Sequence, residues 1–321
     1  MKTNKAVFYA PLYVTAIMVL LSISEKLLTI TAINGADDFF FTSVILQLFV
    51  YMIPAALYCK LRKLDFIEAS GTKIFSASDL PFVIALFLVY AFGMLFLIYL
   101  GAVPSSSNAV NSVLQNIPAS DSFFVNLCYV VIPAIVEEML FRSVLLSEYA
   151  TFKKGYALII TSLFFAMLHF SFSGFISFFW AGLVFGTITV ITGSAIPSTL
   201  LHMLSNFITL TFSGVLSDFL TSAENSVVLI FLLTVFFLLS LYLAISSLQT
   251  IFEKRSAEYD MGTLRGSRRD AVKRLARAGK VEEKGLKETL KKQTNTLQDM
   301  FLSPTVLLAV FIFIFITLGL V

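Results

Sequence analysis

Long runs of apolar residues, repeated along the chain, are the feature that most limits how this sequence can fold. A helix needs about 20 such residues to cross a bilayer. Only 13% of the 321 residues are charged, against about 25% in a soluble domain. A soluble fold cannot hide this much apolar surface, so we expect an all-α, polytopic transmembrane helix bundle. The nine runs that reach or nearly reach the required length cover roughly residues 6–24, 39–59, 80–103, 122–147, 156–172, 174–193, 195–215, 226–248 and 303–321.

The runs divide the chain into three parts. Residues 1–250 hold about eight core spans and contain, at 122–215, the polar motifs described below. Residues 251–302 form the one soluble-looking region, which we expect to be a basic, helical, cytoplasmic loop. Residues 303–321 form a ninth, C-terminal span. Within the core, the stretch Gly182–Gly186 is a GxxxG surface, which allows two helices to approach closely.

The positions of Lys and Arg predict the orientation of the bundle. With the N-terminus in the cytoplasm, only Lys26 and Arg142 of the 23 basic residues fall outside the inner loops and inner terminus. This distribution satisfies the positive-inside rule. The loop from Lys254 to Lys292 is strongly basic, which suits anionic lipid headgroups; a docking site for a partner is the alternative. We therefore predict a multi-pass protein of the cell membrane, with the lipid bilayer and no nucleic acid as a partner. The sequence does not define an oligomeric state.

Ionisable side chains inside the predicted spans are the natural candidates for function, because each costs roughly 2.5–3.5 kcal/mol at a helix centre. The stretch VIPAIVEEMLFR, residues 131–142, places two acids and a guanidinium in the fourth span. Glu138 and Arg142 are spaced i,i+4 and can pair on one helix face. Glu137 points about 100° away and has no such local partner. Pro133, one turn earlier, frees a backbone carbonyl and can kink the helix.

The chain has only two histidines, and both fall in predicted spans. His169 ends the stretch FAMLH, which begins at Phe165, and His202 begins HMLSN, which ends at Asn206. His202 and Asn206 share a helix face because they are spaced i,i+4. Counting 1.5 Å per residue from the cytoplasmic ends puts Glu137 and the two histidines at depths of roughly 10 to 20 Å. The three side chains can therefore meet in one layer of the membrane.

These residues form three motifs, and the motifs and their order along the chain resemble those of the CPBP intramembrane proteases, also called the Abi or type II CAAX-protease family. The resemblance covers about residues 122–215, and it uses both histidines of the chain. The basic loop and the ninth span look like additions to the family's usual eight-helix core. The motifs are EExxxR at Glu137, Glu138 and Arg142, FxxxH at Phe165 and His169, and HxxxN at His202 and Asn206.

The resemblance implies hydrolysis of a peptide bond in a membrane-embedded or membrane-associated peptide or protein. In the family's glutamate-based scheme, Glu137 and His169 hold and activate a water molecule. His202 and Asn206 form the site for the oxyanion. Family members act on prenylated CAAX tails, in bacteriocin or pheromone maturation, and in bacteriocin immunity, and the sequence does not select among these. The other motif residues have supporting roles: Glu138, Arg142 and Phe165.

The family has also been classed as metalloproteases, so a metal-based scheme stays open. Glu137, His169 and His202 would give zinc three ligands and leave a position for water. Glu138 would then be the base. The spacing is not the HExxH of soluble zinc proteases, and Asn206 is a poor zinc ligand. We therefore favour the metal-free scheme, with no certain cofactor and zinc as the alternative.

Two functions from other classes also remain open. A non-catalytic membrane immunity or scaffold protein could keep the same helices, although no residue of the three motifs is degraded. A proton- or ion-coupled transporter also places Glu and His inside the membrane. Against a transporter, the sequence shows no inverted repeat and no matched pair of broken helices.

Overall fold

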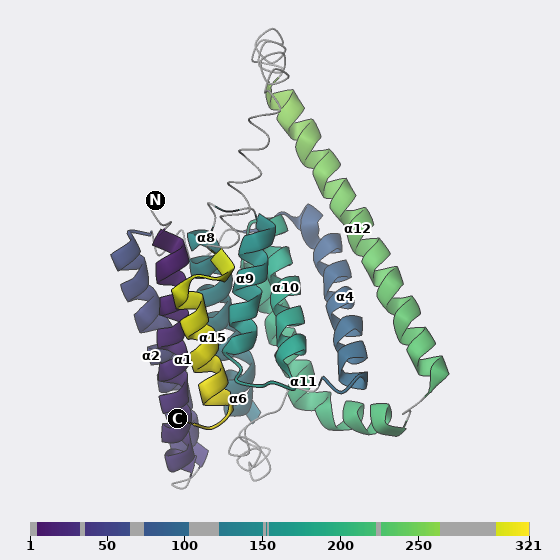
Figure 1. The fold of residues 1–321 in the computed structure, drawn as a ribbon. Helices are drawn as coiled ribbons and strands as arrows, with labels where there is room; N and C mark the ends of the chain where they lie inside the picture. The colour runs from purple at the N-terminus through teal and green to yellow at the C-terminus, as the bar shows by residue number, and fades with distance from the viewer. Residues whose placement is uncertain are drawn as a thin grey trace.

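The fold is a bundle of helices that stand side by side, with α12 (Val227–Thr263) leaning away from the rest (Figure 1). All regular structure in the described residues is helical, so the predicted all-α bundle is confirmed. Residues 264–299 of the basic loop lie outside the described residues, and so does most of its predicted helix. The computed structural model describes residues 5–32, 36–64, 74–102, 122–149, 152, 154–222, 226–263 and 300–320.

Each of the nine predicted runs coincides with helix, but two of these helices are shorter than a span. In the part of the chain that is described, six helices are long and apolar enough to cross a membrane, or seven if the bent α11 is included. The short helices α9 and α15 have 14 residues each, about 21 Å against the roughly 30 Å of the hydrocarbon layer. The helices outside the fourth run are α1 (Lys5–Ala32), α2 (Ala36–Arg62), η1 (Ala77–Asp79), α4 (Leu80–Tyr99), α9 (Lys154–Met167), α10 (Phe175–Thr192), α11 (Ile196–Ser222), α12 (Val227–Thr263) and α15 (Pro304–Thr317).

Local backbone conformation explains two of the departures from nine straight spans. The fifth run was expected to stay helical to residue 172, but α9 ends at Met167 and Phe170 adopts a left-handed φ of 45°. In the seventh run, α11 bends by 70° between Ile196–Phe212 and Gly214–Leu220. Apolar run length predicts where a helix lies, but it does not reveal such turns.

The fourth run is helical throughout, but it alternates between α-helix and π-helix. Two of its segments are π-helices, in which each N–H bonds to the carbonyl five residues back. One π segment precedes Pro133 and the other follows Glu138, so the acidic pair lies on a short α-helical piece between them. The segments are α6 (Ser122–Asn126), η3 (Leu127–Val131), α7 (Ile132–Glu138), η4 (Met139–Leu145) and α8 (Leu146–Glu148).

A glutamine from α2 repairs the hydrogen-bond ladder that Pro133 interrupts. Ile132 donates to the carbonyl of Leu127, five residues back. The next donor in that pattern would be Pro133, which has no N–H, so the Cys128 carbonyl lacks its helical partner. The side-chain Nε2 of Gln47 donates to this carbonyl at 3.1 Å. This bond fastens α2 to the fourth span on the N-terminal side of the acidic pair.

Replacing Gln47 by Leu should therefore destabilise the bundle. The Cys128 carbonyl would be left without a donor in an apolar layer, which costs about 1–3 kcal/mol. Thermal unfolding in detergent measures the effect. Gln47→Met, which keeps the length of the side chain but has no hydrogen-bond donor, should behave like Gln47→Leu. Leu48→Val on the exposed face of α2 is the matched control, and an equal loss in that variant would contradict the assignment.

Small residues set how closely the helices of the core approach. A Cβ atom on Gly182 would lie 2.9 Å from the Cα atom of Ser162 in α9. Only glycine allows the α9 and α10 backbones to come this close. The predicted GxxxG contact is thus confirmed, and it packs α10 against the helix that leads to His169.

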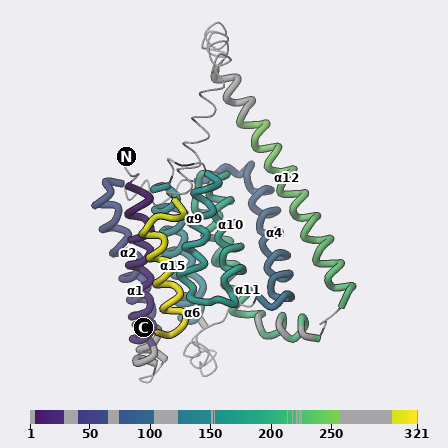
Figure 2. Tube along the Cα trace, in the orientation of Figure 1, coloured from purple at the N-terminus to yellow at the C-terminus, as the bar shows by residue number. Residues whose placement is uncertain are grey.

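Contacts between residues far apart in the sequence hold α15 and α12 to the rest of the bundle. Figure 2 traces α15 alongside α1, so the C-terminal helix lies against the N-terminal one, and the hydroxyl of Thr305 donates to the Val7 carbonyl at 3.1 Å. Arg255 of α12 bonds to Asp79 at 2.9 Å and to the Ile191 carbonyl at 2.7 Å. These two bonds tie α12 to η1, which leads into α4, and to the end of α10.

Candidate active site

Three of the four side chains expected to be catalytic meet inside the bundle. Glu137 lies at the end of α7, His169 in the turn just after α9, and His202 in the second turn of α11. One carboxylate oxygen, Glu137 Oε2, lies 3.9 Å from Nε2 of His169 and 3.9 Å from Nε2 of His202. The two imidazoles therefore face the same oxygen atom from different helices.

The hydrogen bond of His169 defines which of its ring nitrogens carries a proton. Its Nδ1 lies 2.8 Å from the backbone carbonyl oxygen of Phe165. A carbonyl only accepts, so Nδ1–H is the donor. In a neutral ring, Nε2 then presents a lone pair towards Glu137. The ring also stacks on Phe178, with centroids 3.7 Å apart, which fixes its plane.

His202 is oriented by a carboxylate and not by a backbone carbonyl. Its Nδ1 lies 3.1 Å from Oε1 of Glu138. The other oxygen of Glu138 forms an ion pair with Nε of Arg142 at 3.2 Å, so the carboxylate of Glu138 lies between His202 and Arg142. Phe185 stacks on the His202 ring, with centroids 5.1 Å apart. The arrangement resembles the acid that orients the histidine of a catalytic triad.

Arg142 is buried together with Glu138, and their predicted pairing on one helix face is confirmed. Its Nη2 donates to the carbonyl of Gly182 at 3.4 Å. Its guanidinium lies over the ring of Phe165, 4.6 Å from the centroid. The last two contacts hold Arg142 against α10 and α9, so the i,i+4 pair also anchors the fourth span to its neighbours.

Glu137 differs from Glu138 in having no fixed partner. Its side chain keeps 14% of its surface exposed, and Oε2 makes no hydrogen bond with the described residues. A separation of 3.9 Å is too long for a direct hydrogen bond but is one that a single water molecule can bridge. Among the described residues, Oε2 of Glu137 is therefore not committed to a hydrogen bond.

Asn206 lies one turn beyond His202 on α11 and is half-buried. Within the described part of the chain, its amide makes no hydrogen bond, so no hydrogen bond joins it to Glu137 or to the histidines. Sequence spacing predicted the shared face with His202, and the uninterrupted helix agrees. Four further contacts were not foreseen: the Glu138–His202 bond, the Gly182 carbonyl under Arg142, and the stacking rings Phe178 and Phe185. No local pattern in the sequence connects positions so far apart.

The fit to a metal ion can be tested on the distances. Glu137, His169 and His202 offer the nitrogen and oxygen atoms that zinc binds. Ligand atoms on a tetrahedral zinc at 2.0–2.1 Å lie about 3.3 Å apart, whereas the nitrogen-to-oxygen distances here are 3.9 Å. No group of three or more His, Cys, Asp or Glu among the described residues is compact enough to hold a metal. The spacing of these side chains is thus wider than a tetrahedral zinc site requires.

Comparison with known families agrees with the motifs. Residues 119–208 match the sequence model of the family described as "Type II CAAX prenyl endopeptidase Rce1-like", and this segment contains every residue from Glu137 to Asn206 named above. The family resemblance is therefore confirmed over that segment. Together with the apolar helices, it supports a multi-pass membrane protease of the CAAX type. No curated protein and no solved structure matches the chain significantly.

Proposed function

We propose that this protein is an intramembrane endopeptidase that hydrolyses a peptide bond by a metal-free mechanism. Its substrate is a membrane-embedded or membrane-associated peptide or protein. One observation carries the proposal: Nε2 of His169 and Nε2 of His202 both face Oε2 of Glu137 at 3.9 Å. An acid between two imidazoles can hold a water molecule, take its proton and return that proton later.

The different partners of the two histidines suggest different roles. His169 donates from Nδ1 to a backbone carbonyl, so a neutral ring accepts a hydrogen bond from water at Nε2. Glu137 removes the water proton as the water oxygen attacks the substrate carbonyl carbon. The proton then passes from Glu137 to the leaving amine as the carbon–nitrogen bond breaks.

His202 and Asn206 are assigned to the developing oxyanion. In this proposal His202 carries a proton on each ring nitrogen, and it donates from Nδ1 to the carboxylate of Glu138 and from Nε2 to the oxyanion. Asn206, with an amide that has no partner in the described residues, adds a second donor one turn away. Donors aimed at developing charge in a water-poor site are usually the largest single contribution to catalysis.

We further propose that the N-terminus lies in the cytoplasm of a cell whose plasma membrane holds this bundle. The Lys and Arg distribution supports this orientation. Two ion pairs, Arg62–Glu148 and Arg255–Asp79, join residues that this orientation places on the cytoplasmic side.

Comparison of membrane proteomes tests the function even before the substrate is identified. Cells that express the wild-type protein should release fragments that cells expressing Glu137→Gln do not, and the uncut precursor should accumulate in the variant. Identical sets of fragments in the two strains, at equal protein levels, would overturn the proposal and favour a non-catalytic role.

The metal-free mechanism also predicts the zinc content of the purified protein and its response to chelators. Purified, active protein should hold well below one zinc per chain, and chelators should leave its activity unchanged, because the 3.9 Å spacing of the three side chains is wider than a tetrahedral zinc site requires. Elemental analysis of wild type and His169→Ala checks this. One zinc per chain in the wild type, lost together with activity in His169→Ala, would establish the metal scheme instead.

A further inference from the structure

A cavity of about 430 Å³ lies between α4 and α11, beside the candidate active site. This volume is within the range of ligand pockets in proteins. Most of its wall is apolar, and residues on both sides of the α11 bend line it, so the bend wraps α11 around the cavity. Its apolar wall includes Phe87, Met94, Ile98, Ile208, Phe212 and Leu216.

A polar stripe joins this cavity to the candidate active site. His202, Ser205, Asn206 and Thr209 occupy positions i, i+3, i+4 and i+7 of α11 and therefore share one face. Ser205 and Thr209 line the cavity. The cavity thus begins less than one helical turn beyond His202.

Hydroxyl groups stand at the inner end of the cavity, where the polar stripe meets α4. The hydroxyl of Tyr90 on α4 is hydrogen-bonded to the hydroxyl of Ser205. Each hydroxyl has one proton, so the pair uses one donor and leaves one. Thr209 is exposed and makes no hydrogen bond with the described residues. The cavity therefore offers free polar groups along one edge.

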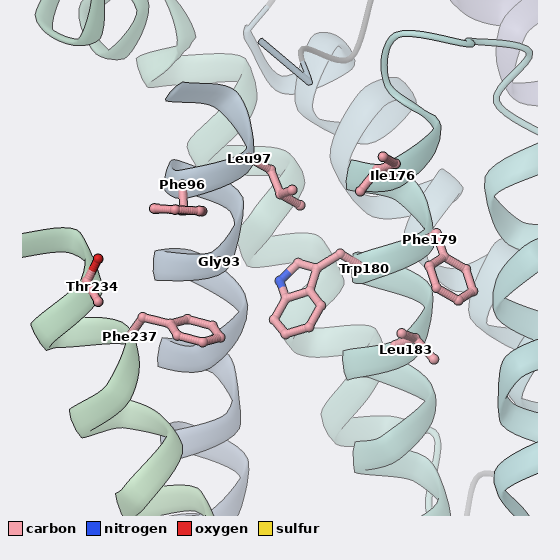
Figure 3. A pocket seen from close by; sticks show the side chains of 9 residues that line it. All are labelled: Gly93, Phe96, Leu97, Ile176, Phe179, Trp180, Leu183, Thr234 and Phe237. Atoms are coloured by element: carbon pink, nitrogen blue, oxygen red, sulfur yellow. The ribbon is translucent and has the colours of Figure 1, made fainter. Parts of the chain in front are cut away.

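A second cavity on the other side of α4 provides the contrast. It has a volume of about 300 Å³ and is lined by α4, α10 and α12, as Figure 3 shows. Its polar atoms are already bonded: the Trp180 indole N–H donates to the Tyr90 carbonyl at 3.3 Å, and the Thr234 hydroxyl donates to the Ile230 carbonyl at 2.8 Å. Such a wall suits a hydrocarbon chain, which has no hydrogen-bonding groups.

A peptide segment, unlike a hydrocarbon chain, has backbone groups that must form hydrogen bonds when it binds. To be cut, it must leave the helical conformation, and each backbone group it releases costs several kcal/mol in a layer without water unless it finds a partner. A site for such a segment must combine an apolar wall for side chains with donors and acceptors for the backbone. The α4–α11 cavity has both, and the cavity of Figure 3 has only the first.

We propose that the α4–α11 cavity binds the unwound, apolar segment of the substrate next to the scissile bond. Its side chains enter the cavity, and its backbone bonds to Ser205, Thr209 and the Tyr90 hydroxyl. The occupant is a peptide and not a lipid chain. The inference rests on the proposed proteolytic function, since it places the scissile bond at the adjacent Glu137 site.

Photocrosslinking tests this binding without requiring hydrolysis. The full chain with Glu137→Gln is placed in liposomes with a short apolar peptide that carries one diazirine-bearing leucine. Crosslinks should map to α4 and α11 residues of the cavity. Ala91→Trp, which fills the cavity, should reduce labelling at least about tenfold, the effect of 1.4 kcal/mol on an equilibrium constant.

Thr234→Trp, which fills the cavity of Figure 3, is the matched control and should leave labelling unchanged. Thr209→Val keeps the side-chain shape, removes one hydroxyl, and should weaken labelling several-fold even if Ala91→Trp fails to fold. Crosslinks that map to the other cavity would overturn the proposal. So would a diazirine phospholipid that labels the α4–α11 cavity and excludes the peptide. Correct crosslinks with no hydrolysis by the wild-type protein would overturn the proposed function alone.

Discussion

Glu137→Gln should abolish peptide hydrolysis and leave the fold intact. Glutamine has the same shape but cannot take the proton of the attacking water. General bases contribute about 10²–10⁴-fold to catalysis, so we expect a loss of at least that size in the cleavage rate. The fold should tolerate the change because Oε2 of Glu137 makes no hydrogen bond with the described residues. The rate is measured in proteoliposomes on a prenylated CAAX peptide or on a substrate found by proteome comparison.

Two controls separate chemistry from folding in this experiment. The unfolding temperature of Glu137→Gln should equal that of the wild type. Glu137→Asp keeps the carboxylate but withdraws it from the two imidazoles, so its rate should lie between those of the wild type and Glu137→Gln. If Glu137→Gln cleaves within a few-fold of the wild-type rate, Glu137 is not the base and the mechanism is wrong.

The acidic pair shows what sequence spacing can and cannot reveal about the site. Helical geometry alone separated Glu138, which has Arg142 one turn away, from Glu137, which has no local partner. The structure agrees with that division. It adds that Glu138 also bonds to His202, a contact between residues 64 positions apart in the chain. Spacing rules apply within one helix, so a contact between helices depends on packing that no single motif encodes.

Hydropathy predicted where the helices of the core lie, but it did not predict the hydrogen bonds within and between them. The run that contains Pro133 reads as one continuous span, yet it alternates between α- and π-helical winding. Pro133 was expected to free a carbonyl, and the structure identifies the donor that compensates, Gln47 on α2. A polar residue in an apolar run was therefore a signal for this contact, but its partner could be identified only in three dimensions.

The turn after α9 is a second feature of the site that hydropathy did not predict. His169 was expected within a membrane span, but it lies just past the end of α9, where Phe170 adopts a left-handed φ. There its Nδ1 can reach the carbonyl of Phe165, which leaves Nε2 free to face Glu137. The early end of the helix is thus part of how the site is assembled.

Arg142→Met should produce the largest loss of stability of any single substitution in the site. Glu138 is fully buried, and removing its cationic partner leaves an uncompensated charge, which costs about 3–5 kcal/mol. The variant also loses the bond to the Gly182 carbonyl and the contact with the Phe165 ring. Thermal or denaturant unfolding in detergent measures the loss.

A double variant distinguishes stability from catalysis. Replacing a buried ion pair by apolar residues of similar size is often neutral or stabilising, so Glu138→Leu with Arg142→Met should recover most of the lost stability. It should not recover hydrolysis, because Nδ1 of His202 then has no carboxylate to orient it. A double variant that is both stable and fully active would show that the Glu138–His202 bond plays no part in the reaction.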